Sequence, residues 1–237
     1  MSEADFNIDS LASYLHLMPQ QVSRLADRGK VPGRKVSGEW RFSRAEIHHW
    51  LEERIGTSDC DIELAEMEGV LQRHADPEQT EVTIAEMLSM NAIAIPLASK
   101  TRDSTIHAMV NLAHDTGHLW DPERMADAVR ARENMHPTAL SCGVALMHPR
   151  RPMSDILAEP ILALGRTVQG IPFGGQGGQL TDLFFLICST SDQTHLRTLA
   201  RISRLINDSE VLSAIRSAED AQQTYDILVQ RETDLNT

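Results

Sequence analysis

Three things are scarce in this 237-residue sequence: cysteine, long apolar stretches and positive charge. Cys60, Cys142 and Cys188 lie far apart and form no CxxC pair, which argues against a disulfide or zinc framework and favours reduced thiols in the cytoplasm. No apolar run approaches the roughly 18 residues that a membrane span needs, and the acidic start of the chain lacks a signal-peptide core. We therefore expect a cytoplasmic protein that needs no membrane, no metal and no cofactor.

The shortage of positive charge is confined to one part of the chain. Lys and Arg number 22 against 34 Asp and Glu, which gives a net charge of −12. Residues 1–54 hold eight of each sign, so the whole excess of acid lies in residues 55–237. Between residues 24 and 44, seven bases stand against two acids. A compact basic patch on an acidic chain predicts one local anionic partner.

The basic region has a compact pattern of elements. Apolar residues at helical spacing predict helices over 8–15 and 19–28, with Pro19 opening the second and Gly29 ending it. A β-hairpin over 31–42 follows, turning at Ser37-Gly38, and a third helix then begins. Five short sequence segments, which we call phrases, follow one another in this order: Leu11–Leu15, Val22–Leu25, Gly29–Pro32, Trp40–Phe42 and Ile47–Leu51.

In order and spacing these phrases resemble the small winged helix-turn-helix DNA-binding domains of the excisionase and MerR-like kind. The resemblance implies that helix 19–28 enters a major groove of DNA and that the hairpin is a wing. Three exposed side chains of that helix would reach base edges: Gln20, Gln21 and Arg24. Five bases would meet phosphates: Arg28, Lys30, Arg34, Lys35 and Arg41. A solvated basic face, or a helix-turn-helix used for protein contact, is the alternative.

The rest of the chain alternates strands and helices, which predicts an α/β domain. We expect a winged helix-turn-helix domain at 1–55, an acidic linker or dimerising helix at 56–78, and an α/β domain at 79–237. Within the last we predict short strands at 92–97, 143–147, 161–164 and 183–188. Helices are predicted over 82–88, from Asp103, from Asp121-Pro122 to Arg132, from Asp192, and within 209–231. The glycine-rich 174–178 lacks the Lys-Ser/Thr of a P-loop and predicts a turn.

His148 stands where the predicted strand 143–147 exits into a loop, a usual place for a reacting side chain. A neutral imidazole is a nucleophile, and Arg150 and Arg151 would steady a dianion beside it, contact a partner, or simply be solvated. His114 and His118 stand one helical turn apart and suit either a metal or a surface pair, but no third ligand is evident.

His148 ends one motif, and four further stretches accompany it. Thr138 to His148 is similar to the motif Thr-Gly-Ile-Gly-x-Gly-Ile-Ala-Ile-Pro-His; Arg132-Glu133 precedes it; Gly170-Ile-Pro-Phe-Gly, Leu183-Phe-Phe-Leu-Ile and Asp192-x-x-His195 follow. In this order residues 80–231 resemble the IIA domain of the mannitol/fructose class of the bacterial phosphotransferase system, including its nitrogen-regulatory branch. The resemblance implies a mixed sheet flanked by helices.

The same resemblance assigns roles. His148 would accept a phosphoryl group from a phosphohistidine carrier protein, with His195 as the family's second histidine, Arg132 as its active-site arginine and Thr138 as a hydroxyl donor. The sequence departs from the motif where Ala139-Leu140-Ser141 replaces Gly-Ile-Gly, and where Met147 replaces proline.

Together the two resemblances predict a homodimeric transcriptional regulator whose IIA-like domain reports phosphotransferase status. Two alternatives stay open. One is a phosphohistidine-based phosphotransferase component that passes phosphate to a sugar-specific partner. The other is a degenerate IIA fold that senses a partner or ligand without being phosphorylated, which the departures from the motif favour.

Overall fold

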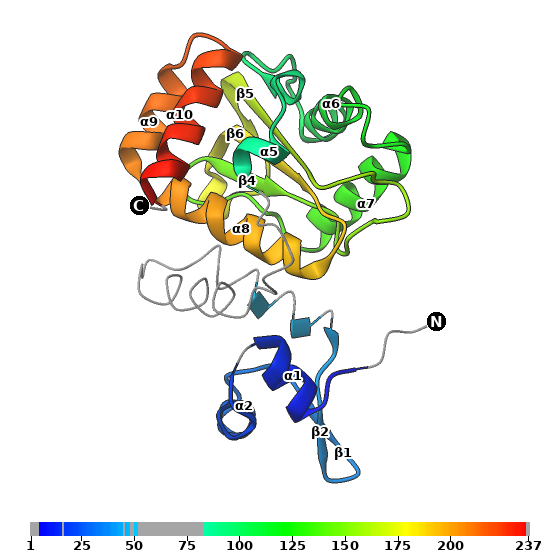
Figure 1. Cartoon of the computed structure of the whole chain (residues 1–237). Helices are drawn as coiled ribbons and strands as arrows, with labels where there is room; N and C mark the ends of the chain where they lie inside the picture. The colour runs from blue at the N-terminus through cyan, green and yellow to red at the C-terminus, as the bar shows by residue number, and fades with distance from the viewer. Residues whose placement is uncertain (1–4, 16, 45, 48–49, 52–82, 236–237) are drawn as a thin grey trace. The chain divides into compact units, whose positions relative to one another are not determined.

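The computed structural model describes residues 5–15, 17–44, 46–47, 50–51 and 83–235, and the chain divides into two compact units, 1–80 and 81–237 (Figure 1). The predicted linker over 56–78 and Ala45 of the predicted third helix lie outside the described residues. No helix in the described ranges is long and apolar enough to cross a membrane.

Among its described residues, the first unit holds two short helices and a hairpin, and residues 44, 46–47 and 50–51 after the hairpin are also helical. Its elements are α1 (Ile8–Leu15), α2 (Pro19–Asp27), β1 (Arg34–Val36) and β2 (Glu39–Arg41). Pro19 stands in the first turn of α2, and Gly29 follows the helix with φ +65°, a conformation that a glycine adopts without steric cost. Ser37 and Gly38 both have positive φ, the type I′ turn that matches the twist of paired strands. These predictions are confirmed.

A small apolar core holds this unit together. The side chains of Leu11, Val22, Val31, Phe42 and Ile47 are all buried. They come from both helices, from the approach to the hairpin and from the segment after it, so each element contributes an apolar face to one core.

The second unit is a four-stranded mixed sheet with helices on both faces. The strand order is β3 (Ile93–Ala94), β5 (Ile161–Pro172), β6 (Leu180–Cys188) and β4 (Val144–Met147). The central pair is antiparallel, while β3 and β4 run parallel to their neighbours. This confirms the predicted α/β class with a mixed sheet.

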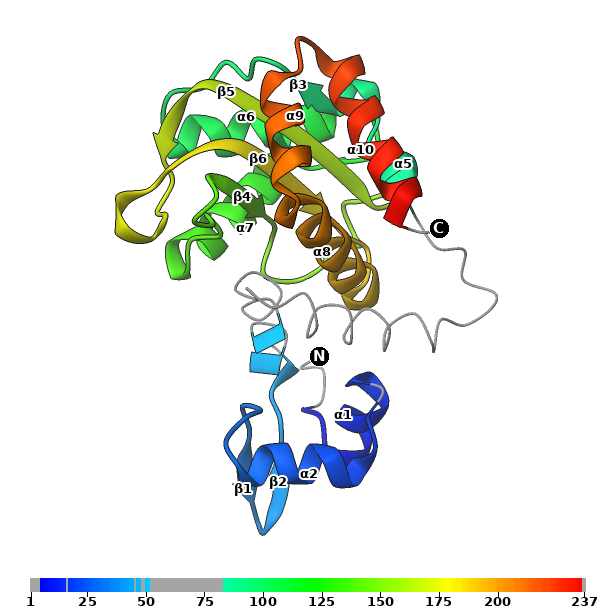
Figure 2. The same cartoon turned by 90° about the vertical axis from the view of Figure 1, so that its left-hand side faces the viewer.

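Helices α6 (Arg102–His114) and α7 (Pro122–Met135) cover one face of the sheet (Figure 2). The other face carries α8 (Asp192–Asn207), α9 (Ser209–Ser217) and α10 (Ala221–Leu235), with the short α5 (Ile84–Met87) against α10. All four residues of β4 are buried, because this strand is covered on both faces.

The structure corrects the predicted strand lengths. The strand expected over 92–97 is only two residues long, because a 3-10 turn at Met90–Ala92 precedes it and Pro96, which has no N–H to donate, follows. Strands β5 and β6 extend well beyond their apolar runs, to a 3-10 turn at Gln176–Gly178. In β5 a bulge between Arg166 and Ile171 interrupts the alternation of apolar and polar residues. That alternation is the pattern from which the full length of the strand would have been predicted.

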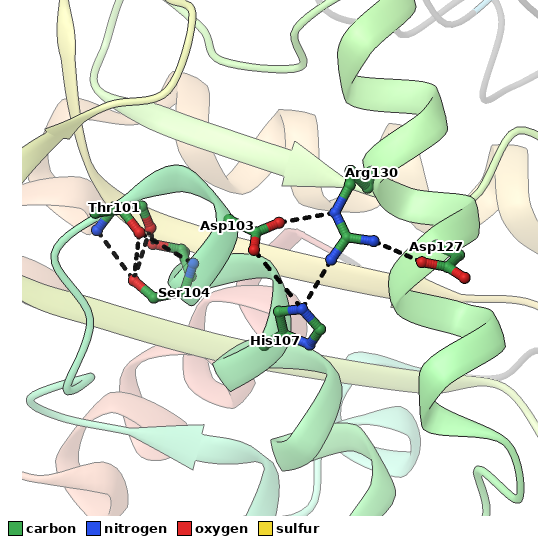
Figure 3. Close-up of polar contacts among 7 residues, drawn as sticks. Thr101, Asp103, Ser104, His107, Asp127 and Arg130 are labelled. Atoms are coloured by element: carbon green, nitrogen blue, oxygen red, sulfur yellow. Dashed lines mark hydrogen bonds and ion pairs between the residues drawn. The ribbon is translucent and has the colours of Figure 1, made fainter.

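The predicted helix start at Asp103 is also wrong. Thr101 caps α6, its side chain accepting the N–H of Ser104 at 3.2 Å. Asp103 sits in the first turn and instead accepts from the Arg130 guanidinium of α7 at 2.7 Å, which lowers the pKa of Asp103 (Figure 3). Arg130 also donates to Asp127 and to the ring of His107. The aspartate therefore joins two helices rather than capping one.

Candidate functional site

A tight turn leads into strand β4, and His148 follows the strand. The turn spans residues 140–143: Gly143 donates to the carbonyl of Leu140 at 3.2 Å, and Leu140 donates to that of Val144 at 2.8 Å. Gly143 has φ +80°, which favours glycine there. The strand then pairs with β6 through its four residues. His148 follows directly at its carboxyl end and is only 2% exposed.

The ring of His148 is held by the backbone of its own strand. Its Nδ1 lies 2.8 Å from the carbonyl oxygen of Leu146. A carbonyl oxygen can only accept, so Nδ1 carries the proton in this bond. In the neutral imidazole Nε2 is then the unprotonated, nucleophilic nitrogen. The structure thus assigns the two nitrogens, which the sequence leaves open.

The structure brings His195 to His148. His195 lies in the first turn of α8, where its N–H donates to the carbonyl of Ser191, the N-cap residue. Its side chain is 4% exposed, and the two imidazole centroids are 4.8 Å apart at an interplanar angle of 58°. Residues 47 positions apart in the sequence therefore form one buried pair, set beside the positive end of a 16-residue helix.

Arg132 and Thr138 lie on the segment that leads into the turn. Arg132 is buried in the last turn of α7, and its Nη1 donates to the carbonyl of His136 at 2.6 Å. The hydroxyl of Thr138 donates to the carboxylate of Glu133, and its N–H donates to the same group at 3.1 Å. Both predicted residues therefore fix the chain between α7 and β4 in this conformation.

Glu133 is a site residue that sequence reasoning missed. Its side chain is fully buried, and burial raises the pKa of its carboxyl group against the opposing effects of the Thr138 hydrogen bonds and of His148. Arg102, at the start of α6, brings a guanidinium nitrogen to 3.7 Å from the carboxylate and lies over the Phe173 ring. The adjacent Arg132-Glu133 pair was a visible signal for Glu133, whereas nothing local marks Arg102.

Other predicted residues lie away from this pair or take ordinary partners. Arg150 and Arg151 are exposed on the loop after His148. His114 contacts the carbonyl of Leu119 at 2.8 Å, and His118 lies 3.3 Å from Glu159. Among the described residues there is no cluster of three metal-binding side chains. The surface-pair interpretation of the two histidines therefore fits the contacts better than a metal site.

The basic surface of the first unit is exposed and only loosely paired. Gln20, Arg24, Arg28 and Lys30 are exposed on α2 and just after it. The side-chain oxygen of Gln21 accepts the N–H of Met18 at 2.9 Å, which leaves its amide group as a donor.

On the hairpin, each predicted phosphate contact has a solvent-facing acidic neighbour. The pairs are Arg34 with Asp5 at 3.2 Å, Lys35 with Asp27 at 3.4 Å and Arg41 with Glu39 at 3.0 Å. Exposed pairs of this kind contribute little, about 0–1 kcal/mol, so an anionic partner can displace them.

The first unit, with α1, α2 and the hairpin, is a helix-turn-helix domain, and the second unit, with its mixed sheet and buried histidine pair, is an α/β domain. Residues 86–231 match the family described as phosphoenolpyruvate-dependent sugar phosphotransferase system, EIIA 2, and the chain belongs to that family. Residues 6–55 match a helix-turn-helix domain family.

Curated relatives agree with the family. The chain is 29% identical over 151 residues to the fructose-specific EIIABC component of Bacillus subtilis, covering 63% of this chain but only 23% of that longer protein. It is 30% identical over 130 residues to a nitrogen regulatory protein of Bradyrhizobium diazoefficiens, covering 53% of this chain and 83% of the relative.

Solved structures show the same fold. The nitrogen regulatory protein IIA-Ntr from Neisseria meningitidis superposes with a TM-score of 0.56 at 19% identity, covering 61% of this chain and 98% of that one. IIA mannitol from Escherichia coli gives 0.53 at 16% identity, covering 59% and 97%.

Proposed function

We propose that this protein is a DNA-binding transcriptional regulator whose IIA domain is phosphorylated on His148 by a phosphohistidine carrier protein. One observation carries the proposal. A chain with a helix-turn-helix domain also holds a histidine whose Nδ1 is fixed on the Leu146 carbonyl, next to a second buried histidine. That arrangement suits a nucleophile, and it stands in a protein otherwise equipped to bind DNA.

The proposed transfer is a displacement at phosphorus. The lone pair on His148 Nε2 forms the new N–P bond, the bond from phosphorus to the carrier's histidine nitrogen breaks, and that nitrogen keeps the electron pair. Nδ1 keeps its proton throughout and donates it in the hydrogen bond to the Leu146 carbonyl. His195 and the positive end of α8 would stabilise charge on the phosphoryl oxygens, with Arg132 as the family's arginine.

The DNA contacts follow from the exposed face of the first unit. We propose that Gln20, Gln21 and Arg24 reach base edges from α2, within a winged domain of the excisionase kind. Phosphates would be met by five bases: Arg28, Lys30, Arg34, Lys35 and Arg41. A single small domain makes few contacts, so a homodimer in the cytoplasm would supply the affinity.

The coupling between the domains is electrostatic. Phosphorylation adds one net negative charge while Nδ1 keeps its proton, and up to about two if that proton is then lost. It adds them to the part of the chain that already holds the whole net charge of −12, while the DNA-binding part is locally basic. We propose that the added charge changes the electrostatic attraction of the IIA domain for the basic domain or for the twin subunit, and through it the affinity for DNA.

The phosphorylation step is tested with a carrier protein charged with radiolabelled phosphate. The wild type should acquire acid-labile label, and His148→Ala should acquire none. His118→Ala is the matched control, because His118 is a histidine of the same domain that instead pairs with Glu159. Equal labelling of the wild type and His148→Ala would overturn the assignment of the site.

Two other functions each have an observation in their favour. The fructose-specific EIIABC relative favours a phosphoryl-transfer component, which would pass label on to a sugar-specific acceptor. The motif departures at Ala139-Leu140-Ser141 and Met147 favour a sensor that is not phosphorylated. Onward transfer of label selects the first, and DNA binding without any labelling selects the second.

A further inference from the structure

Arg216 lies 68 residues after His148 and outside the motifs that carry the family resemblance, yet its side chain reaches the turn in front of that histidine. It stands in the last turn of α9. Its Nε and Nη2 donate to the two carboxylate oxygens of Asp182 at 2.9 and 2.8 Å. Nη2 also donates to the backbone carbonyl of Cys142 at 2.6 Å. One guanidinium therefore joins a helix, strand β6 and the turn at 140–143.

The turn is held from the strand side as well. The N–H groups of Asp182 and Leu183 both donate to the carbonyl of Gly143, at 3.0 and 3.3 Å. A Cβ on Gly143 would lie 3.0 Å from the Arg216 Nη2 and 3.2 Å from the Asp182 carboxylate. Successive carbonyls of the turn, Cys142 and Gly143, are thus each bound by the same Arg216–Asp182 unit, and a side chain at Gly143 would push against that unit in addition to straining the positive φ.

The Arg216–Asp182 pair and its bonds to the turn form a clamp, and a second arginine holds this clamp in place. Nη1 of Arg166, on β5, donates to the carbonyl of Ile215 at 2.8 Å and to that of Arg216. These bonds tie down the end of α9 from which Arg216 projects. The Asp182 carboxylate raises the pKa of Arg216, as a bidentate pair should. Both side chains are about one-third exposed, so the pair is partly shielded from water.

Backbone hydrogen bonds connect the turn to the strand that ends at His148. Beyond the turn, Ala139 pairs with Ala145, and the N–H of Leu146 donates to the carbonyl of Thr138 at 3.3 Å. The carbonyl of the same Leu146 holds the Nδ1 proton of His148. The position of the turn therefore determines where Leu146 and Thr138 lie. The carbonyl of Leu146 fixes the imidazole of His148, and Thr138 binds Glu133.

We propose that Arg216, acting through Asp182 and the Cys142 carbonyl, is a positioning residue: it keeps His148 in the tautomer whose Nδ1–H donates to the Leu146 carbonyl and whose Nε2 is the nucleophile. The inference rests on the proposed phosphorylation of His148. It explains how this chain orders a strand exit that has Met147 where the related motif has proline. The segment leading through the turn also differs, with Ala139-Leu140-Ser141 in place of Gly-Ile-Gly.

The test compares Arg216→Met, Arg216→Lys and Asp182→Asn with a control pair of the same kind. Arg124→Met removes an arginine that pairs with Asp155 elsewhere on this unit. Two readouts are taken on the full chain: the ring ¹⁵N resonances of His148, which report the tautomer, and single-turnover phosphoryl transfer from the charged carrier.

For Arg216→Met we expect a mixture of His148 tautomers and a transfer rate constant about tenfold lower at saturating carrier, with the half-saturating carrier concentration unchanged. Arg216→Lys and Asp182→Asn should fall between this and the wild type, because each keeps part of the clamp. Arg124→Met should match the wild type in both readouts.

An unchanged tautomer and rate in Arg216→Met would overturn the proposal, and so would a lowered melting temperature with a normal tautomer, because that result describes a merely structural clamp. If Arg216→Met does not fold, Asp182→Asn decides by the same two readouts. If the wild type takes no label, the proposed phosphorylation fails, and the tautomer comparison still decides whether Arg216 positions His148.

Discussion

The two units of this chain carry their candidate functional groups in opposite environments. In the first unit the predicted DNA contacts are mostly exposed, and their ion pairs face solvent. In the second unit the two histidines and the Arg132-Glu133 pair are buried, and each of the four is bound to backbone or to a neighbouring ring. The first arrangement suits recognition by charge, which tolerates loose geometry. The second suits chemistry, which requires fixed geometry.

The largest effect should come from the buried histidine pair. His195→Gln keeps a side chain of similar size but removes the imidazole 4.8 Å from that of His148. We expect the rate of phosphoryl transfer to fall about a hundredfold, the scale for losing one group that stabilises charge in a transition state. Quenched-flow measurement of acid-labile phosphate checks this. An unchanged rate would remove His195 from the site.

A buried arginine should matter more for stability than an exposed one. Arg132→Met removes the hydrogen bond that the buried Arg132 side chain donates to the backbone carbonyl of His136, just past the end of α7. We expect a loss of about 2–3 kcal/mol in the opening free energy of the sheet, measured by hydrogen exchange. Arg28→Met, on the exposed face, should change stability by less than about 0.5 kcal/mol. Equal effects in the two variants would break the contrast between the units.

The exposed arginine should matter for DNA binding instead. Arg28→Ala should reduce the slope of log affinity against log salt concentration by about 1, because one fewer phosphate contact releases one fewer counterion. Lys100→Ala is the control, since Lys100 is an exposed base of the second unit. Fluorescence anisotropy over a salt series measures both slopes. A slope change in the Lys100 variant would show that the second unit also touches DNA.

The smallest effect concerns Glu133. Burial raises its pKa in the folded protein above the ordinary 4.5. The folded state then holds the proton more tightly than the unfolded chain, so the wild type loses stability as pH rises from 4.5 to the raised value. Glu133→Gln does not titrate. Its stability relative to the wild type should therefore increase with pH across that window and level off above it. Melting temperatures over a pH series measure this, and a constant difference would contradict it.

The sequence predicted features that depend on local pattern. The Ser37-Gly38 turn, the start of α2 at Pro19 and the mixed α/β class follow from residue types at short spacing. The strand carrying His148 could also be predicted, because a continuous apolar run between turn residues is typical of a strand buried on both faces. The order of motifs indicated that His195 belongs near His148.

Contacts between distant residues could not be predicted in the same way. Asp103 has the chemistry of a helix cap, but a tertiary partner, Arg130, engages it. Neither Arg102 beside Glu133 nor Arg216 beside the 140–143 turn leaves a local trace, because each reaches its partner only through the packing of helices on the sheet. The tautomer of His148 likewise depends on where one backbone carbonyl lies in space.

The central claim is that phosphorylation at His148 changes DNA binding. The direct measurement uses a DNA fragment selected from a random pool by the unphosphorylated protein, and compares its affinity before and after treatment with charged carrier. The account predicts a change of several-fold or more in the wild type and none in His148→Ala. Identical binding curves for the wild type, with full labelling confirmed in the same sample, would contradict it.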